Sequence, residues 1–144
     1  MKKRNIYNIG IIVFVLGVLV WGPAVGVGLA LPEPEQVVSG SADLTYPDAS
    51  TLKIDASDKA IINYKSFDIA QNESVIINLP GADKEILNRV TGNTASSILG
   101  RLTANGIFML VNPNGINIGK SANIDAAGFL CIPSKFIISK TCAS

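Results

Sequence analysis

The chain has 144 residues, enough for one ordinary domain and a targeting segment. It carries 12 basic and 11 acidic side chains, and removing the three basic residues at positions 2–4 leaves 9 against 11, a net charge of −2. This balance argues against nucleic acid as a partner, which would require a basic face. Without histidine, and with only two cysteines, neither a zinc site nor a histidine-based catalytic arrangement is expected. We expect no cofactor, no metal ion and no enzymatic activity.

Residues 1–30 have the layout of a secretory signal peptide. Positions 1–4 are positively charged, residues 6–31 are almost wholly apolar, and Gly28 and Ala30 supply the small residues of a cleavage site. We predict cleavage after Ala30. The alternative is an uncleaved membrane anchor, because the apolar run is long enough to span a bilayer. In either case the rest of the chain lies outside the cytoplasm, and the membrane is involved only through this segment.

The remaining chain is dominated by strand signals. Residues 32–50 are rich in Pro, Glu, Ser and Gly, with a possible short edge strand at Val37 and Val38. Beyond them, short apolar or alternating runs are bounded by turn residues, and only 84–87 and 95–99 are short helix candidates. We predict strands at 51–54, 60–63, 66–69, 74–79, 106–111, 116–118 and 122–124.

Strands this brief, joined by tight links, favour an all-β fold of the parallel β-helix type over a sandwich of longer strands. In such a solenoid each coil buries one or two apolar side chains per strand against its neighbours. Three apolar runs end in asparagine, at Asn63, Asn78 and Asn112. We predict from these a ladder of side-chain amides at a corner of the solenoid.

Residues 60–130 contain five sequence blocks in order that resemble a known family. The blocks are "INYKSFDI", "ESVIINLP", "LNRVTG", "SSILGRLTANG" and "NPNGINIG". Together they resemble the amino-terminal secretion domain of filamentous haemagglutinin-type exoproteins, the TPS domain of two-partner secretion systems. The family's second short motif, Asn-Pro-Asn-Leu, has no counterpart here.

The resemblance implies a right-handed parallel β-helix with a capped amino end. It also implies export through the general secretory machinery. An outer-membrane barrel of the Omp85 type would then recognise the chain in the periplasm through its POTRA domains. The family includes adhesins, haemolysins and contact-dependent toxins, whose activities reside in long carboxy-terminal repeats. The expected location is therefore secreted or at the cell surface, by way of the periplasm and outer membrane.

The resemblance fades after Leu130, and the family domain is considerably longer. We therefore expect a truncated family member, incomplete at the carboxy end. It would comprise a signal peptide (1–30), a partial secretion domain (31–130) and a divergent tail (131–144). Both cysteines, Cys131 and Cys142, fall in this tail. They could form a disulfide in an exported chain or remain two thiols.

The sequence Asn112-Pro113-Asn114-Gly115 has each residue type where a type I β-turn favours it. It is either a tight corner or, by the family resemblance, part of a surface that the transporter recognises.

The "LNRVTG" block, by the same resemblance, adds Asn88, Arg89 and Gly92 to the candidate transporter-recognition residues. From the residue types alone, Gly92 could close a turn in a left-handed conformation and Asn88 could bond neighbouring backbone. We expect Arg89 to pair with a carboxylate of the same domain.

The leading hypothesis is a secretion-recognition domain. The alternatives are a β-helical polysaccharide-active enzyme fragment and an inactive membrane-anchored stump. An enzyme of that kind needs clustered carboxylates. Asp55 and Asp58 are the obvious pair, but Asp55-Ala56-Ser57-Asp58 is more typical of a polar turn between strands.

Overall fold

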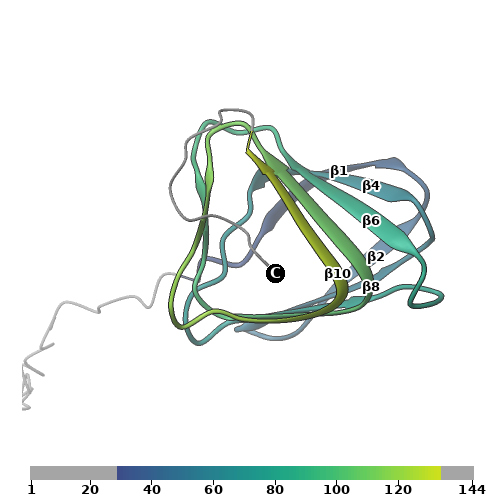
Figure 1. The fold of residues 1–144 in the computed structure, drawn as a ribbon, viewed down its shortest axis with the longest axis horizontal. Coiled ribbons are helices and arrows are strands. Elements are labelled where there is room, and N and C mark those ends of the chain that lie inside the picture. Colours follow the sequence, from purple (N-terminus) through teal and green to yellow (C-terminus); the bar gives the residue numbers. More distant parts are fainter. Residues whose placement is uncertain (1–28, 134–144) are drawn as a thin grey trace, which may run out of the picture.

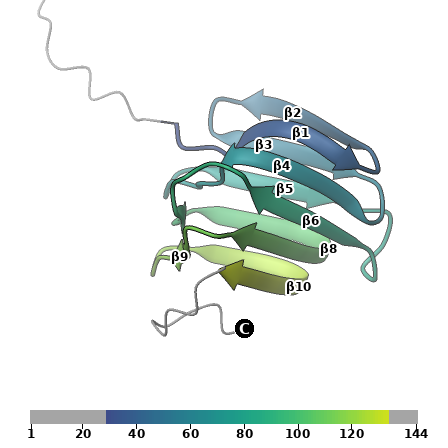
Figure 2. The ribbon, with the colours of Figure 1, turned by 90° about the horizontal axis from the view of Figure 1, so that it is seen from above.

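The structure, a computed structural model, describes residues 29–133 (Figures 1 and 2). The predicted signal segment up to residue 28 lies outside this range. Residues 29–133 contain no helix, and hence none able to span a membrane. The ten strands are β1 (Glu33–Ser39), β2 (Ala42–Asp48), β3 (Thr51–Ala56), β4 (Ala60–Ser66), β5 (Ser74–Asn78), β6 (Glu85–Val90), β7 (Ser96–Ile98), β8 (Arg101–Asn112), β9 (Ile116–Ile118) and β10 (Asn123–Pro133).

The strands wind into a parallel β-solenoid of about four turns, which confirms the predicted fold class. The coils are roughly triangular in outline and stack on one another (Figures 1 and 2). The first wall consists of β3, β5 and the first part of β8, all parallel. The second wall consists of β4, β6 and the second part of β8. The third wall is the pair β7 and β9, and β10 adds a further layer to β8 along both other walls.

A single long strand, β8, joins the first and second walls, so that both belong to one eight-stranded sheet. Its residues Arg101–Ala104 pair with β5 and its residues Ile107–Val111 pair with β6. Between them, Asn105 accepts a hydrogen bond from Leu79 N and donates one to Leu79 O, both at 2.7 Å. The amide thus satisfies backbone groups that the bend leaves outside the ladder.

The amino end of the solenoid is covered by two antiparallel strands. β1 pairs with β4 on the second wall, and β2 pairs with β3 on the first. The edge strand predicted at Val37 and Val38 is part of β1, but the sequence did not indicate β2. The buried carboxylate of Glu73 accepts a hydrogen bond of 2.8 Å from Ala70 N. This end is therefore capped, as the resemblance implied.

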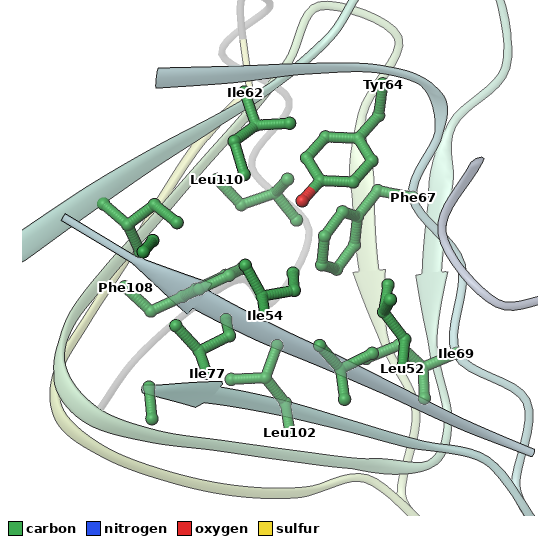
Figure 3. Close-up of a cluster of buried hydrophobic side chains, with 14 of the residues drawn as sticks. Leu52, Ile54, Ile62, Tyr64, Phe67, Ile69, Ile77, Leu102, Phe108 and Leu110 are labelled. Atoms are coloured by element: carbon green, nitrogen blue, oxygen red, sulfur yellow. The ribbon is translucent and has the colours of Figure 1, made fainter. Parts of the chain in front are cut away.

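The core is a column of inward-facing side chains, supplied mainly by β3–β8 and by the corner at Phe67 and Ile69 (Figure 3). An aromatic row crosses the coils, with ring centroids 5.1 Å apart for Tyr64 and Phe67, 5.8 Å for Phe67 and Phe108, and 5.6 Å for Phe108 and Phe129. Burial raises the pKa of the Tyr64 hydroxyl. Cys131 packs against this core from β10. Cys142 lies outside the described residues, so the disulfide remains a prediction.

Both predicted helices are wrong. Residues 84–87 overlap β6 and residues 95–99 contain β7. Stacking between β4 and β8 buries Ile86, and stacking in the third wall buries Ile98. This packing overrides the local helix propensity of short segments. The strand predicted at 66–69 is a corner instead, with one bridge from Ile69 to Ile98.

The predicted asparagine ladder is also wrong. Asn63 is in register with Arg89, Asn78 with Asp55, and Asn112 with Pro133. A ladder requires asparagines in register on adjacent coils, and these three occupy different rows. Their amides bond other groups instead.

Candidate functional site

Residues 112–115 form the predicted turn at the junction of β8 and β9. The turn is closed by a hydrogen bond of 3.1 Å from Gly115 N to Asn112 O. Gly115 has a φ of +111°, which favours glycine because other side chains rarely adopt it. The local chemistry of the tetrapeptide is therefore sufficient to reverse the chain here.

The first residue of the turn faces the interior. Asn112 is fully buried, and its Nδ2 donates to Thr94 O at 3.0 Å and to Ser96 Oγ at 2.9 Å. Its Oδ1 accepts a bond of 2.9 Å from Asn114 N. One buried amide thus ties the turn to the preceding coil, and its role in the folded domain is structural.

The exposed tip of the turn consists of Pro113 and Asn114. Asn114 Nδ2 donates to Gly92 O at 2.8 Å and to Asn112 Oδ1 at 3.1 Å. Two of the sequence blocks, "LNRVTG" and "NPNGINIG", therefore meet in space, 22 residues apart in the chain. We name residues Gly92 and 112–115 the recognition corner.

Gly92 is required here for a different reason from the one predicted. Its φ is not positive; among residues 29–133 the glycines with positive φ are Gly40 and Gly115. A Cβ on Gly92 would instead collide with the carbonyl oxygen of Lys65 on the adjacent coil. The position demands glycine because two backbones approach closely.

Asn88 and Arg89 face opposite sides of β6. Asn88 is fully buried, and its Nδ2 donates to Met109 O on the next coil at 3.2 Å. Its side chain therefore cannot contact a partner while the domain is folded. Arg89 faces outward, half-buried, and its Nε donates to Asn63 Oδ1 at 3.1 Å. The expected ion pair is wrong, because the three ion pairs found in residues 29–133 do not include Arg89.

The groups that support the corner were not among the predicted site residues. Thr91 Oγ1 donates to Glu35 Oε2 at 2.7 Å and lies 3.1 Å from Tyr64 O, which links the corner to the cap strand β1. Ser96, which accepts from Asn112, lies in the "SSILGRLTANG" block. The blocks therefore included two supports of the corner, Thr91 and Ser96, whereas Glu35 lies upstream of all of them.

The turn predicted at residues 55–58 is correct only in part, because Asp55 lies in β3 and Asp58 lies in the turn between β3 and β4. Asp55 pairs with Lys53 at 2.8 Å and accepts a bond of 2.8 Å from Asn78 Nδ2. The hydrogen bond from Lys53 and then that from Asn78 hold the pKa of Asp55 below its usual value. Asp58 accepts a bond of 3.2 Å from Glu85 N. Both carboxylates have structural partners, and no cluster of three or more potential metal ligands occurs in residues 29–133.

The stacked coils, the antiparallel cap and the supported turn define a secretion domain of the TPS class. Residues 31–132 match the family described as "TPS secretion domain", and the chain belongs to this family. TPS exoproteins are secreted to the cell surface or extracellular space, and their TPS domains work with a cognate outer-membrane transporter.

The chain is also similar to individual proteins. It is 38% identical over 126 residues to a heme/hemopexin-binding protein of Haemophilus influenzae, and the matched region covers 86% of this chain and 14% of that protein. A heme/hemopexin-binding protein of strain ATCC 51907 is 37% identical over 123 residues, with 85% and 14% covered. The crystal structure of the HMW1 secretion domain from Haemophilus influenzae has a TM-score of 0.67 and 41% identity, with 69% and 27% covered. The chain thus spans a small part of each relative's length.

Proposed function

We propose that a cognate outer-membrane transporter recognises this chain through its periplasmic POTRA domains, and that the recognition corner is part of the contacted surface. The observation that supports this is the contrast within the turn itself. Asn112 is buried and Gly115 supplies the unusual backbone, whereas the side chains of Pro113 and Asn114 are exposed on a firmly anchored tip. The exposed pair is accessible to a partner.

In this proposal, residues 1–30 are a signal peptide removed after Ala30, and residues 31–130 are the secretion domain that precedes a divergent tail at 131–144. The general secretory machinery delivers the chain to the periplasm. There it docks partly folded, with the coils that form the recognition corner already stacked, by surface contact or by addition of a strand to the transporter. The chain then crosses the barrel and folds outside, coil by coil, because each coil packs chiefly on its neighbours.

The choice of variant for testing this proposal follows from the bonds of Asn114. Its amide donates to two oxygens, Gly92 O and Asn112 Oδ1. Asn114→Asp would place a carboxylate against both and destabilise the corner whether or not a transporter reads it. A loss of secretion in that variant would therefore be ambiguous.

Pro113→Ala is the sharper test, with Pro80→Ala as its control. Both prolines are exposed and lie in loops. Replacing either one increases the conformational entropy of the unfolded chain, so both variants should lower the free energy of unfolding by a comparable amount, about 0.4–1 kcal/mol. We expect Pro113→Ala to reduce secretion through the cognate transporter several-fold, with Pro80→Ala near the parent and similar thermal midpoints in both. Equal secretion by the two variants would mean that the turn is only a corner.

A further inference from the structure

The outer surface of the second wall carries a row of aliphatic side chains that crosses four strands. Ile61 of β4 is in register with Leu87 of β6, Leu87 with Met109 of β8, and Met109 with Leu130 of β10. Each points outward, because the residues before and after it face the core. With strands about 4.8 Å apart, the row is about 14 Å long. We name these four residues the aliphatic stripe.

A shallow hollow of about 150 Å³ lies within the stripe. Ile61, Leu87 and Met109 line it together with Ala60, Lys59 and Glu85. The strands beneath are paired with one another, so the hollow presents side chains and few unpaired backbone groups. An apolar group inserted here would remove aliphatic surface from water on both partners.

Arg89 adds a charged group beside the stripe. It lies in the next row, in register with Asn63 on one side and Val111 on the other. The Asn63 side chain accepts from Nε and so orients the guanidinium on the wall. Its other N–H groups have no acceptor among residues 29–133. They can donate to a carboxylate of a partner in the forked geometry that arginine favours.

The first wall has no such stripe on the corresponding row. There, Lys53 of β3 is in register with Ile76 of β5, then Thr103 of β8 and Asp125 of β10. Three of these four outward positions are polar or charged. Coil stacking therefore does not require an aliphatic exterior, and the stripe needs another explanation.

A further coil would not cover the stripe. Additional coils stack beyond β10, along the direction in which β4, β6, β8 and β10 follow one another, and the cap occupies the opposite end (Figure 2). The stripe faces sideways from that direction. It is, however, continuous with the recognition corner, because Met109 precedes Asn112 by three residues on β8, about 10 Å along an extended strand.

We propose that the aliphatic stripe and Arg89 form a second docking surface for the periplasmic part of the cognate transporter. The matching surface on the transporter is aliphatic, inserts one apolar side chain into the hollow and carries a carboxylate opposite Arg89. This proposal rests on the proposed function, since it takes the same transporter as the partner. It adds that recognition extends along the second wall from the turn to the hollow.

The test compares two substitutions on the same strand. Met109→Glu and Thr103→Glu both place a carboxylate at an outward, half-buried position of β8, one on each wall. The probe is the purified periplasmic part of the transporter, and the readout is its affinity for the full exported protein. We expect Met109→Glu to weaken binding about tenfold or more, as for an interface hot spot, and Thr103→Glu to change it less than twofold. Leu87→Thr is a milder change in the same hollow and should also weaken binding. It keeps the test decisive if Met109→Glu does not fold.

Arg89→Gln supplies an independent readout, with Arg101→Gln on the first wall as its control. Removing a charge that meets a carboxylate should reduce the salt dependence of the affinity. We expect this reduction for Arg89→Gln only. If both glutamine variants keep the parent's salt dependence, the charged part of the proposal is wrong.

The outcomes separate this proposal from the proposed function. If Pro113→Ala weakens binding whereas Met109→Glu and Leu87→Thr match Thr103→Glu, the stripe proposal is overturned and the function stands. If the parent does not bind the periplasmic part, both are overturned. If the stripe variants abolish self-association in sedimentation but leave transporter binding intact, the occupant is a second copy of the chain and the proposal is wrong.

Discussion

The two long walls of the solenoid have similar interiors and different exteriors. Inside, Leu52, Val75 and Leu102 stack in register on the first wall. On the second, Ala60, Ile86 and Phe108 do the same. Outside, the first wall is polar in the row where the second carries the aliphatic stripe. Stacking constrains the inward residues of every coil, whereas the outward residues are free to differ. The exterior is therefore where a surface shaped by a partner can be distinguished from one shaped by folding.

Removing a shared interior residue should have the largest effect. Phe108 is fully buried and contacts the rings of both Phe67 and Phe129. We expect Phe108→Ala to lower the free energy of unfolding by about 3–5 kcal/mol, measured by denaturant titration of the purified protein. Phe129→Ala on the last coil is the control, because that ring is only partly buried. A smaller loss for Phe108→Ala than for Phe129→Ala would mean that the middle of the aromatic row contributes less to the core than its burial indicates.

Asn112→Ala should have the next largest effect, because the second wall ends in the recognition corner. The change removes the bonds to Thr94 O and Ser96 Oγ and leaves the buried Ser96 hydroxyl and the partly buried Thr94 carbonyl without that donor. We expect a loss of about 2–3 kcal/mol, again from denaturant titration. Asn117→Ala, at an exposed position of β9, should change stability by about 0.5 kcal/mol or less. A comparable small change in Asn112→Ala would show that the corner is held by the turn alone.

Much of this arrangement could be predicted from the sequence. The alternation of Leu52 and Ile54 with polar residues marks a half-buried strand, and short runs of this kind favoured the solenoid. The beginning of β8 was missed because Thr103 and Asn105 face outward and Ala104 is a small core residue, which gives a weak apolar signal. Sequence periodicity detects a strand by the large apolar residues on its buried face. A strand with polar outward residues and small inward residues therefore gives too weak a signal to be predicted.

The candidate site could be predicted only in part. Pro113 and Gly115 identify a turn from local chemistry alone. The partners of Asn112 and Asn114 lie 16 to 22 residues earlier in the chain, on the preceding coil. Which groups meet there depends on the length of each coil, and the irregular spacing of the runs did not reveal it. For the same reason the stripe, which needs the register of four strands, was not apparent from the sequence.

Outward aliphatic residues offer a finer comparison of the two walls. Leu87 has Ile61 and Met109 as cross-strand neighbours, whereas Ile76 has Lys53 and Thr103. Aliphatic cross-strand pairs contribute roughly 0.2–1 kcal/mol. We therefore expect Leu87→Thr to cost about 0.5 kcal/mol more than Ile76→Thr in thermal or denaturant unfolding. If Ile76→Thr costs as much or more, the aliphatic cross-strand neighbours of Leu87 add nothing to folding stability, and binding alone would explain the stripe.

The smallest predicted effect is a difference in pH dependence between two aspartates. Asp68, at the corner that leads into the third wall, accepts a bond of 2.8 Å from Ser97 N. Burial raises the pKa of Asp68, and the nearby charge of Glu73 raises it further, although the hydrogen bond from Ser97 N opposes both. On the first wall, the bonds from Lys53 and Asn78 lower the pKa of Asp55.

The two shifts have opposite consequences for stability. A raised pKa means that the folded state holds the proton of Asp68 more tightly than the unfolded state does, so this group destabilises the fold once pH rises through its folded pKa. Charged Asp55 instead stabilises the fold when the pH lies above 3.8, the ordinary pKa of this group. That contribution is lost as pH falls through its lowered pKa. Asp68→Asn retains an acceptor for Ser97 N–H but cannot become charged. Relative to the parent, the free energy of unfolding of Asp68→Asn should therefore rise with pH above the ordinary aspartate pKa of 3.8, whereas that of Asp55→Asn should fall as pH rises toward 3.8 from below. Denaturant titrations on both sides of pH 3.8 measure the two differences, and a common sign for the two variants would contradict the prediction.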